Sequence, residues 1–442
     1  MNYQKKWKEQ NNEKIALCMA MIGLGGLAAC GNGSDTPERE GGEQNGAEEI
    51  TIWAWDPKFN IAAFELAESY HQEENPDFKI NVTEISQQDS VQKMNTIFSS
   101  GSTQGLPNIV LIEDFRARNF LEVFPEYFVP LTEYINVDDF MDYKIEVSSI
   151  DGEQYGMPFD SGVAGVYLRK SIIEEAGLEL SDFTNITWQT FNELGIRVKE
   201  ATGKPLLSID MNDLGHLRMM MHSSGYWYTA EDGETPFIDG NPSLKQGLED
   251  LKMLLDSGVM TTHNGWDQML AGFNSGEVAG VLQGNWITPS VKAEESQSGD
   301  WAVVPVPKQE SIEGSVNATN LGGSSIYVLD IDGKEEALSY IADVFGKNIA
   351  FYEELIQTVG AIGSYVPASQ GDAYHAPDPF FDDQAIYQDF MNWANEIPSV
   401  NFGKNTYALE DIMNQGFLDY VNGADLDEVL KNTQMIADNQ LN

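Results

Sequence analysis

The chain contains few cysteines and few basic side chains. Only Cys18 and Cys30 occur in 442 residues, so a disulfide framework is excluded and stability has to come from packing. Lysine and arginine together number 25, against 70 aspartates and glutamates, which gives a net charge of −45. A protein this acidic lacks the cations that displace counterions from nucleic acid, and anionic lipid repels it. Nucleic acid is therefore excluded as a partner, and a membrane can hold the chain only through a covalent anchor.

Catalytic and metal-binding motifs are also missing from the sequence. The five histidines never lie four residues apart or pair with a cysteine, and the chain has no Gly-x-Ser-x-Gly, Walker or dinucleotide-binding loop. Residues 330–333 begin like a calcium loop but lack the later oxygen ligands, which favours a β-turn. We therefore expect no metal site, no cofactor and no catalytic residues. Because carboxylates are abundant, a glycosidase with two acting carboxyl groups stays open as an alternative.

The N-terminal segment has the features of an export signal. Four lysines precede Ile15 to Leu27, an apolar run of 13 residues that is too short for the ~20-residue helix of a membrane span. The run ends in Leu-Ala-Ala-Cys30, which resembles the lipobox of bacterial lipoproteins. The resemblance implies that residues 1–29 are a signal peptide and that Cys30 receives a diacylglycerol, whose two acyl chains suffice for stable anchoring. The alternative is an ordinary secretory signal; either way the protein is exported.

Two kinds of segment follow the signal. Residues 30–49 carry no bulky apolar side chain and are predicted to form a flexible tether. From Ile50 onward, predicted strands at 50–55, 78–82 and 107–112 alternate with predicted helices at 61–72 and 89–99. This alternation is typical of βαβ units around a largely parallel sheet, and an apolar content of 42% supports at least two domains.

Five segments carry a resemblance to a known family: 53–56, 106–114, 155–162, 284–286 and 301–307. In their order and spacing they resemble an extracellular solute-binding protein (family 1) of carbohydrate ABC transporters, over nearly all of residues 48–442. The resemblance implies an α/β, two-lobed periplasmic-binding-protein-like fold, with a hinge and an interlobe cleft that holds the solute.

The hinge should be made where the chain crosses between lobes, near 155–159, 320–329 and 365–367. Lobe 1 would then comprise 50–159 and 325–367, and lobe 2 would comprise 160–324 and 368–442. Gly322 and Gly323 allow backbone angles that other residues avoid. Such a hinge lets the lobes close around a ligand that stabilises the closed state.

Aromatic and polar residues near the expected cleft suit a sugar. The C–H face of a sugar ring rests on an indole, and its hydroxyls pair with carboxylates, amides or guanidinium groups. Ligands of open α/β sheets bind beyond the carboxyl ends of strands, and in the resembling family Gly284-Asn-Trp286 lies where a stacking aromatic is common. The candidate ligand-binding residues are Trp55, Asp56, Glu113, Asp114, Arg116, Asp160, Asp210, Trp227 and Trp286. Their structural alternatives are core packing for the tryptophans and a solvated helix start for residues 113–116.

The favoured function is a non-catalytic receptor, expected to be a monomer, on the extracellular face of the bacterial cell membrane. It would hold its place through the lipid on Cys30, capture a sugar or oligosaccharide and deliver it to the permease subunits of an ABC transporter. The alternatives are a secreted carbohydrate-active enzyme and a binding protein for a peptide, a polyamine or a metal chelate.

Overall fold

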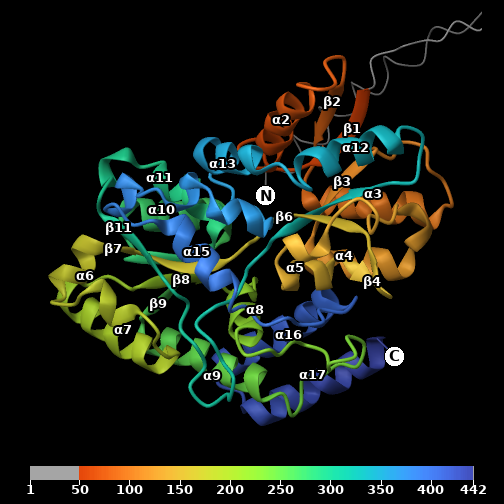
Figure 1. Cartoon of the computed structure of the whole chain (residues 1–442). Coiled ribbons are helices and arrows are strands. Elements are labelled where there is room, and N and C mark those ends of the chain that lie inside the picture. Colours follow the sequence, from red (N-terminus) through yellow and green to blue (C-terminus); the bar gives the residue numbers. More distant parts are fainter. Residues whose placement is uncertain (1–48, 442) are drawn as a thin grey trace, which may run out of the picture. The chain divides into compact units, whose positions relative to one another are not determined.

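The computed structural model describes residues 49–441, in which helices surround two main sheets (Figure 1). The larger sheet has the strand order β2-β1-β3-β12-β6. Its strands are β1 (Glu49–Ala54), β2 (Lys79–Glu84), β3 (Ile109–Glu113), β6 (Gly156–Asp160) and β12 (Ser324–Val328). The central strand β3 is buried on both faces over Ile109–Ile112, which explains its continuous apolar run.

Six helices belong to this part of the chain. They are α2 (Asn60–His71), α3 (Gln87–Ser99), α4 (Asp114–Val123), α5 (Asp142–Val147), α12 (Lys334–Val344) and α13 (Ile349–Thr358). Helix α3 begins earlier than predicted because the hydroxyl of Ser86 accepts a hydrogen bond from the Asp89 N–H at 3.1 Å, which caps the first turn. The Tyr340 hydroxyl of α12 donates to the Phe64 carbonyl of α2 at 2.8 Å and joins the two helices. A short hairpin, β4 (Ser149–Ile150) and β5 (Glu153–Gln154), precedes β6.

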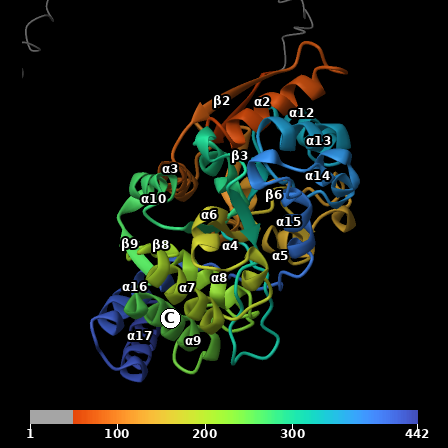
Figure 2. The ribbon, with the colours of Figure 1, turned by 90° about the vertical axis from the view of Figure 1, so that its left-hand side faces the viewer.

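The second main sheet has the order β10-β7-β11 and lies among the remaining helices. Its strands are β7 (Ala164–Arg169), β10 (Gly280–Gly284) and β11 (Trp301–Val304), and a separate parallel pair is formed by β8 (Leu207–Asp210) and β9 (Met260–His263). The helices are α6 (Lys170–Glu175), α7 (Trp188–Thr202), α8 (Gly215–His222), α9 (Pro242–Ser257), α10 (Gly265–Ser275), α11 (Thr288–Lys292), α14 (Asp372–His375), α15 (Ile386–Ala394), α16 (Thr406–Val421) and α17 (Leu426–Leu441). Figure 2 shows α7, α8, α9, α16 and α17 at one end of the described chain, and α2, α12 and α13 at the other.

The expectation of a largely parallel sheet is correct for only part of the fold. Strands β1, β2 and β3 are parallel, as the βαβ pattern predicts. Strand β12 is antiparallel to both β3 and β6, and the β10-β7-β11 sheet is antiparallel throughout. The reason is that β12 returns to this sheet from the second half of the chain and enters it between β3 and β6. Strand β6, which follows β3 through α4 and α5, runs parallel to β3 on the other side of β12.

The connections between the two sheets lie side by side. Val163 forms a bridge with Asn320, and Asp160 forms a bridge with Gly363, so the three predicted crossings meet at the end of β6. Gly322 and Gly323 have φ angles of +75° and +88°, the left-handed region that their glycine identity predicted. The residue boundaries assigned to the two lobes stay a prediction.

The predictions for the N-terminus fall on residues outside the described range. The signal peptide, Cys30 and nearly all of the tether precede Glu49, where β1 begins. Within residues 49–441, no helix is long and apolar enough to cross a bilayer.

Candidate functional site

Two neighbouring cavities open where the ends of β1, β3, β8 and β10 approach one another. The larger cavity has a volume of about 620 Å³ and is lined mainly by the β1–α2 loop, α10, α11 and Gly322–Ser324. The smaller cavity has a volume of about 340 Å³ and is lined mainly by the β8–α8 segment, the start of α10 and Gln283. Both cavities contact Glu113, Trp266, Trp286 and Gly322, so these four residues form the wall that they share.

A pair of tryptophans dominates the shared wall. Trp286 follows β10, and its indole N–H donates to the Leu321 carbonyl at 2.8 Å, which fixes the ring beside the connection to β12. Trp266 lies at the start of α10 and is 48% exposed. The two ring centroids are 5.8 Å apart with an interplanar angle of 31°. An indole this exposed, next to a cavity and a second indole, offers an apolar face to a ligand.

The β1–α2 loop places two of the predicted residues at the larger cavity. Trp55 is half-buried and Asp56 is exposed, and both line the cavity together with Phe59. The side-chain carbonyl of Asn60 accepts hydrogen bonds from the Trp55 N–H at 3.1 Å and the Asp56 N–H at 3.0 Å. This buried asparagine therefore fixes the turn that presents Trp55 and Asp56.

Glu113 reaches both cavities from the end of β3, where the sequence predicted a binding residue. Its carboxylate accepts a hydrogen bond from the Tyr407 hydroxyl of α16 and lies 3.3 Å from Arg116 Nε. The Arg116 guanidinium stacks over the Tyr407 ring, 3.8 Å from its centroid. Arg116 does not line either cavity. In this structure its contacts orient Glu113 and Tyr407, so we interpret Arg116 as a positioning residue.

Asp210 ends β8 and lines the smaller cavity, as its predicted place at a strand end suggested. Its Oδ2 accepts a hydrogen bond from the Gly265 N–H at 2.8 Å, and its Oδ1 accepts one from the Asn212 N–H at 3.0 Å. Burial alone would raise the pKa of Asp210, but the two N–H groups lower it. The carboxylate is therefore ionised at neutral pH and available to accept hydrogen bonds from a ligand.

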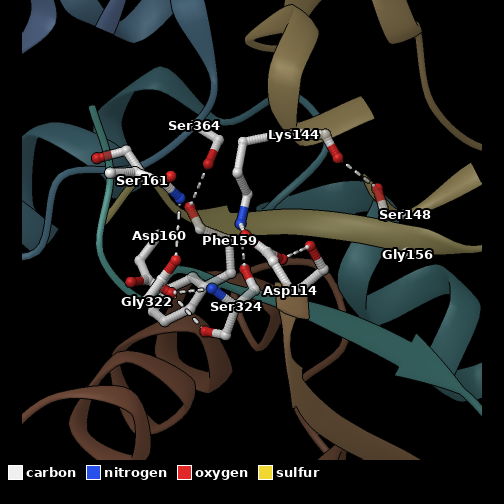
Figure 3. Close-up of polar contacts among 12 residues, drawn as sticks. Asp114, Lys144, Ser148, Gly156, Phe159, Asp160, Ser161, Gly322, Ser324 and Ser364 are labelled. Atoms are coloured by element: carbon white, nitrogen blue, oxygen red, sulfur yellow. Dashed lines mark hydrogen bonds and ion pairs between the residues drawn. The ribbon is translucent and has the colours of Figure 1, made fainter. Parts of the chain in front are cut away.

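Asp114, Lys144 and Asp160 form a buried charge cluster where the connections meet (Figure 3). Lys144 Nζ lies 2.5 Å from Asp114 Oδ2 and donates to the Ser324 carbonyl at 2.9 Å. Asp160 Oδ1 accepts hydrogen bonds from the backbone N–H of Ser324, at 2.9 Å, and from its hydroxyl. Burial raises the pKa of Asp114 to about 6 and the charge of Asp160 adds to the effect, while Lys144 opposes it. Two carboxylates thus share one buried ammonium group.

The structure corrects two predicted ligand contacts. Asp114 is 1% exposed and bonded within the charge cluster, and Trp227 is 2% exposed, with neither of them lining the two cavities. The Trp227 indole N–H donates to Thr406 Oγ1 at 2.9 Å, and its ring packs on Phe402, 4.4 Å between centroids. Trp227 and the neighbouring Tyr228 therefore pack in the core. Asp160 is 3% exposed but does line the larger cavity.

Sequence reasoning missed several residues of the cavities. Trp266 is not among the residues predicted from the sequence, although it follows the end of β9 closely, a position comparable to that of Trp55 after β1. His216, Arg218 and Gln283 line the smaller cavity and come from segments with no recognisable motif. Burial lowers the pKa of His216 to about 4, so its imidazole is neutral at pH 7.

Comparison with known proteins identifies the family. The family model described as bacterial extracellular solute-binding protein matches residues 62–342. The chain belongs to this family. The expected resemblance is thereby confirmed, and the family name agrees with an extracellular or periplasmic location.

Individual relatives extend the match over most of this solute-binding protein. It is 41% identical over 386 residues to the lactose-binding protein of Rhizobium radiobacter, covering 87% of this chain and 91% of the relative. It is 25% identical over 380 residues to the arabinooligosaccharide-binding protein of Halalkalibacterium halodurans, covering 83% of each chain. Both relatives are binding proteins by name, not enzymes.

Solved structures confirm the fold. The GacH receptor of Streptomyces glaucescens, solved unliganded and with acarbose, matches with a TM-score of 0.72 at 18% identity, covering 89% of this chain and 98% of that one. The galacto-N-biose/lacto-N-biose I-binding protein of the ABC transporter from Bifidobacterium longum matches with a TM-score of 0.71 at 18% identity, covering 90% and 98%. The predicted two-lobed α/β fold is therefore correct.

Proposed function

We propose that this solute-binding protein captures lactose, or a closely related neutral galactoside, in the larger cavity against Trp266 and Trp286 and delivers it to the permease of an ABC transporter. The observation that carries the proposal is the wall of Trp266 and Trp286 between two cavities edged with carboxylates. Indole faces suit the C–H face of a galactose ring, and Asp56 and Glu113 suit its hydroxyls. The 41% identity to a lactose-binding protein supports galactosides over other sugars.

The mechanism that we propose is capture by closure, without chemistry. Trp55 and Asp56 lie in the β1–α2 loop, whereas Trp266 and Trp286 lie in segments beside the other sheet. A sugar that contacts both groups stabilises the arrangement that brings them together, because the open arrangement lacks one set of contacts. Small-angle scattering should then give a smaller radius of gyration with saturating lactose than without it.

A thermal-shift panel tests the ligand class. Lactose should raise the melting temperature, since a ligand that binds only the folded state adds ~2.7 kcal/mol of stability at a hundredfold excess over its Kd. Maltose, an arabinan disaccharide, a tripeptide and spermidine should give smaller shifts. After overnight incubation, chromatography should recover the lactose intact. Release of galactose and glucose would instead favour the glycosidase alternative.

We also propose that the lipid on Cys30 holds the protein at the outer face of the cell membrane as a monomer. The proposal rests on the lipobox resemblance at residues 27–30. Cys30→Ala should move the protein from the membrane fraction to the soluble fraction while leaving lactose affinity unchanged, because the predicted tether of residues 30–49 lies between Cys30 and the first cavity residue in the sequence. A Cys30→Ala protein that stays in the membrane fraction would contradict the lipid anchor.

A further inference from the structure

Two residues that line the smaller cavity each have a buried polar atom without a hydrogen-bond partner among residues 49–441. His216 is 7% exposed, and its Nε2 has no hydrogen-bond partner among the described residues. The side-chain carbonyl of Gln283, on the same cavity, is likewise unpaired within residues 49–441. A buried polar atom without a partner costs free energy, about the desolvation penalty of the group. Two such atoms at one cavity therefore indicate that something polar pairs with them in the bound state.

The charges around this cavity define what can enter it. Glu113, Asp210 and Asp213 bring three carboxylates to its lining. The cavity's arginine, Arg218, is already engaged, because its Nη1 lies 2.6 Å from each carboxylate oxygen of Glu410. The neutral imidazole of His216, the side chain of His263 and the amide of Gln283 add further polar groups to the lining. This set matches hydroxyl groups and disfavours a carboxylate or phosphate, which would meet net negative charge.

The position of the smaller cavity relates it to the larger one. Trp266 and Trp286 line both cavities. An oligosaccharide that stacks on this pair of indoles can therefore place one sugar ring in each cavity. The larger cavity, of about 620 Å³, has the Trp55 side as its other wall. The smaller one adds about 340 Å³ of space beyond the pair.

We propose that the smaller cavity is a separate subsite that takes an additional, uncharged sugar unit of a ligand longer than a disaccharide, with His216 Nε2 and the Gln283 carbonyl hydrogen-bonded to its hydroxyls. The inference rests on the proposed function, because it assumes that the larger cavity holds a galactoside. It assigns the protein to neutral galactooligosaccharides of three or more units. His216 becomes the residue that distinguishes the longer ligand from lactose.

Calorimetric titrations with matched sugars test the subsite. The probes are lactose, three trisaccharides in which galactose is joined to the galactose of lactose by a 1→3, 1→4 or 1→6 bond, and 3′-sialyllactose. We expect at least one of the neutral trisaccharides to bind about tenfold more tightly than lactose, which is the range of one added hydrogen-bonded contact. The sialylated sugar, which carries a carboxylate in the added unit, should bind no more tightly than lactose.

Variants of buried histidines supply the second arm. His216→Ala should remove the advantage of the trisaccharide while changing lactose affinity less than twofold, and His216→Gln should restore part of it. His222→Ala is the matched control, because His222 is also buried (1% exposed) but lines neither cavity. It should lower the melting temperature without altering the ratio of the two affinities.

The outcomes separate the two proposals. If lactose binds but no neutral trisaccharide binds more tightly, the separate subsite is wrong and the proposed function stands. Equal weakening of lactose and trisaccharide by His216→Ala, or tighter binding of 3′-sialyllactose, would also overturn the subsite. If neither lactose nor any trisaccharide binds the unaltered protein, the proposed function itself fails.

Discussion

The charge cluster of Asp114, Lys144 and Asp160 and the wall formed by Trp266 and Trp286 lie close together, but they differ in exposure and in hydrogen bonding. In the cluster, Asp114, Lys144 and Asp160 are all at most 3% exposed and bonded to one another or to Ser324. In the wall, Trp266 is 48% exposed and faces cavity space. The groups of the cluster are satisfied inside the protein, whereas those of the wall are left for a ligand. A structural site and a binding site therefore differ in the exposure of their side chains and in whether their polar groups already have hydrogen-bond partners, more than in residue type.

The largest expected effect is a loss of stability when the charge cluster is broken. Lys144→Met removes the ammonium group shared by two buried carboxylates, and breaking a buried ion pair in this way costs about 3–5 kcal/mol of unfolding free energy. Urea unfolding measures the loss. Lys334→Met is the control, because the Lys334–Asp330 pair lies on the surface, where ion pairs contribute little. Similar losses for the two variants would contradict the structural role of Lys144.

The next largest effect is a loss of lactose affinity when the tryptophan wall is altered. Trp286→Ala should weaken lactose binding by about 1–3 kcal/mol, as truncation of an aromatic anchor does at a binding hot spot, and calorimetry measures it. Trp227→Phe is the matched control: it removes the buried hydrogen bond to Thr406 and should lower the melting temperature without changing affinity. If the Trp286→Ala protein binds lactose normally, Trp286 contributes to packing and does not contact the ligand.

The smallest effect is the pH dependence of the cluster. Because the pKa of Asp114 is raised to about 6, the folded protein binds more protons than the unfolded chain between about pH 4 and 6. This group's contribution to stability is therefore present at low pH and is lost as the pH rises through 6. An amide does not titrate, so the stability of wild type minus that of Asp114→Asn should fall from pH 4 to pH 7. Urea unfolding at each pH measures that difference, and a rise would contradict the prediction.

The sequence predicted the fold better than the site. Periodicity located β1, β2, β3 and the helices between them, because each is a local pattern of apolar residues. It did not predict the antiparallel β12, since strand pairing across more than two hundred residues leaves no local signal. The same reason explains why the sequence did not distinguish the roles of Asp114 and Glu113. They are neighbours at one strand end, yet only packing against Lys144 and Tyr407 decides that the first is buried and the second faces the cavities.

The histidines show the other limit of the sequence. His216 and His222 lie six residues apart in α8, and both are buried with a lowered pKa. Only the structure shows that His222 Nε2 is 2.8 Å from the Pro398 carbonyl, whereas His216 lines a cavity and its Nε2 has no partner among residues 49–441. Whether a buried polar atom has a hydrogen-bond partner depends on the folded structure and cannot be read from a sequence motif.

The central claim is that the cavities beside Trp266 and Trp286 bind a galactoside. Calorimetric titration of the purified protein with lactose tests it most directly. We predict saturable heat with a stoichiometry of one and tighter binding of lactose than of maltose, with weaker binding of lactose by Trp286→Ala. Absence of saturable heat with lactose and with the three galactosylated lactoses would contradict the account.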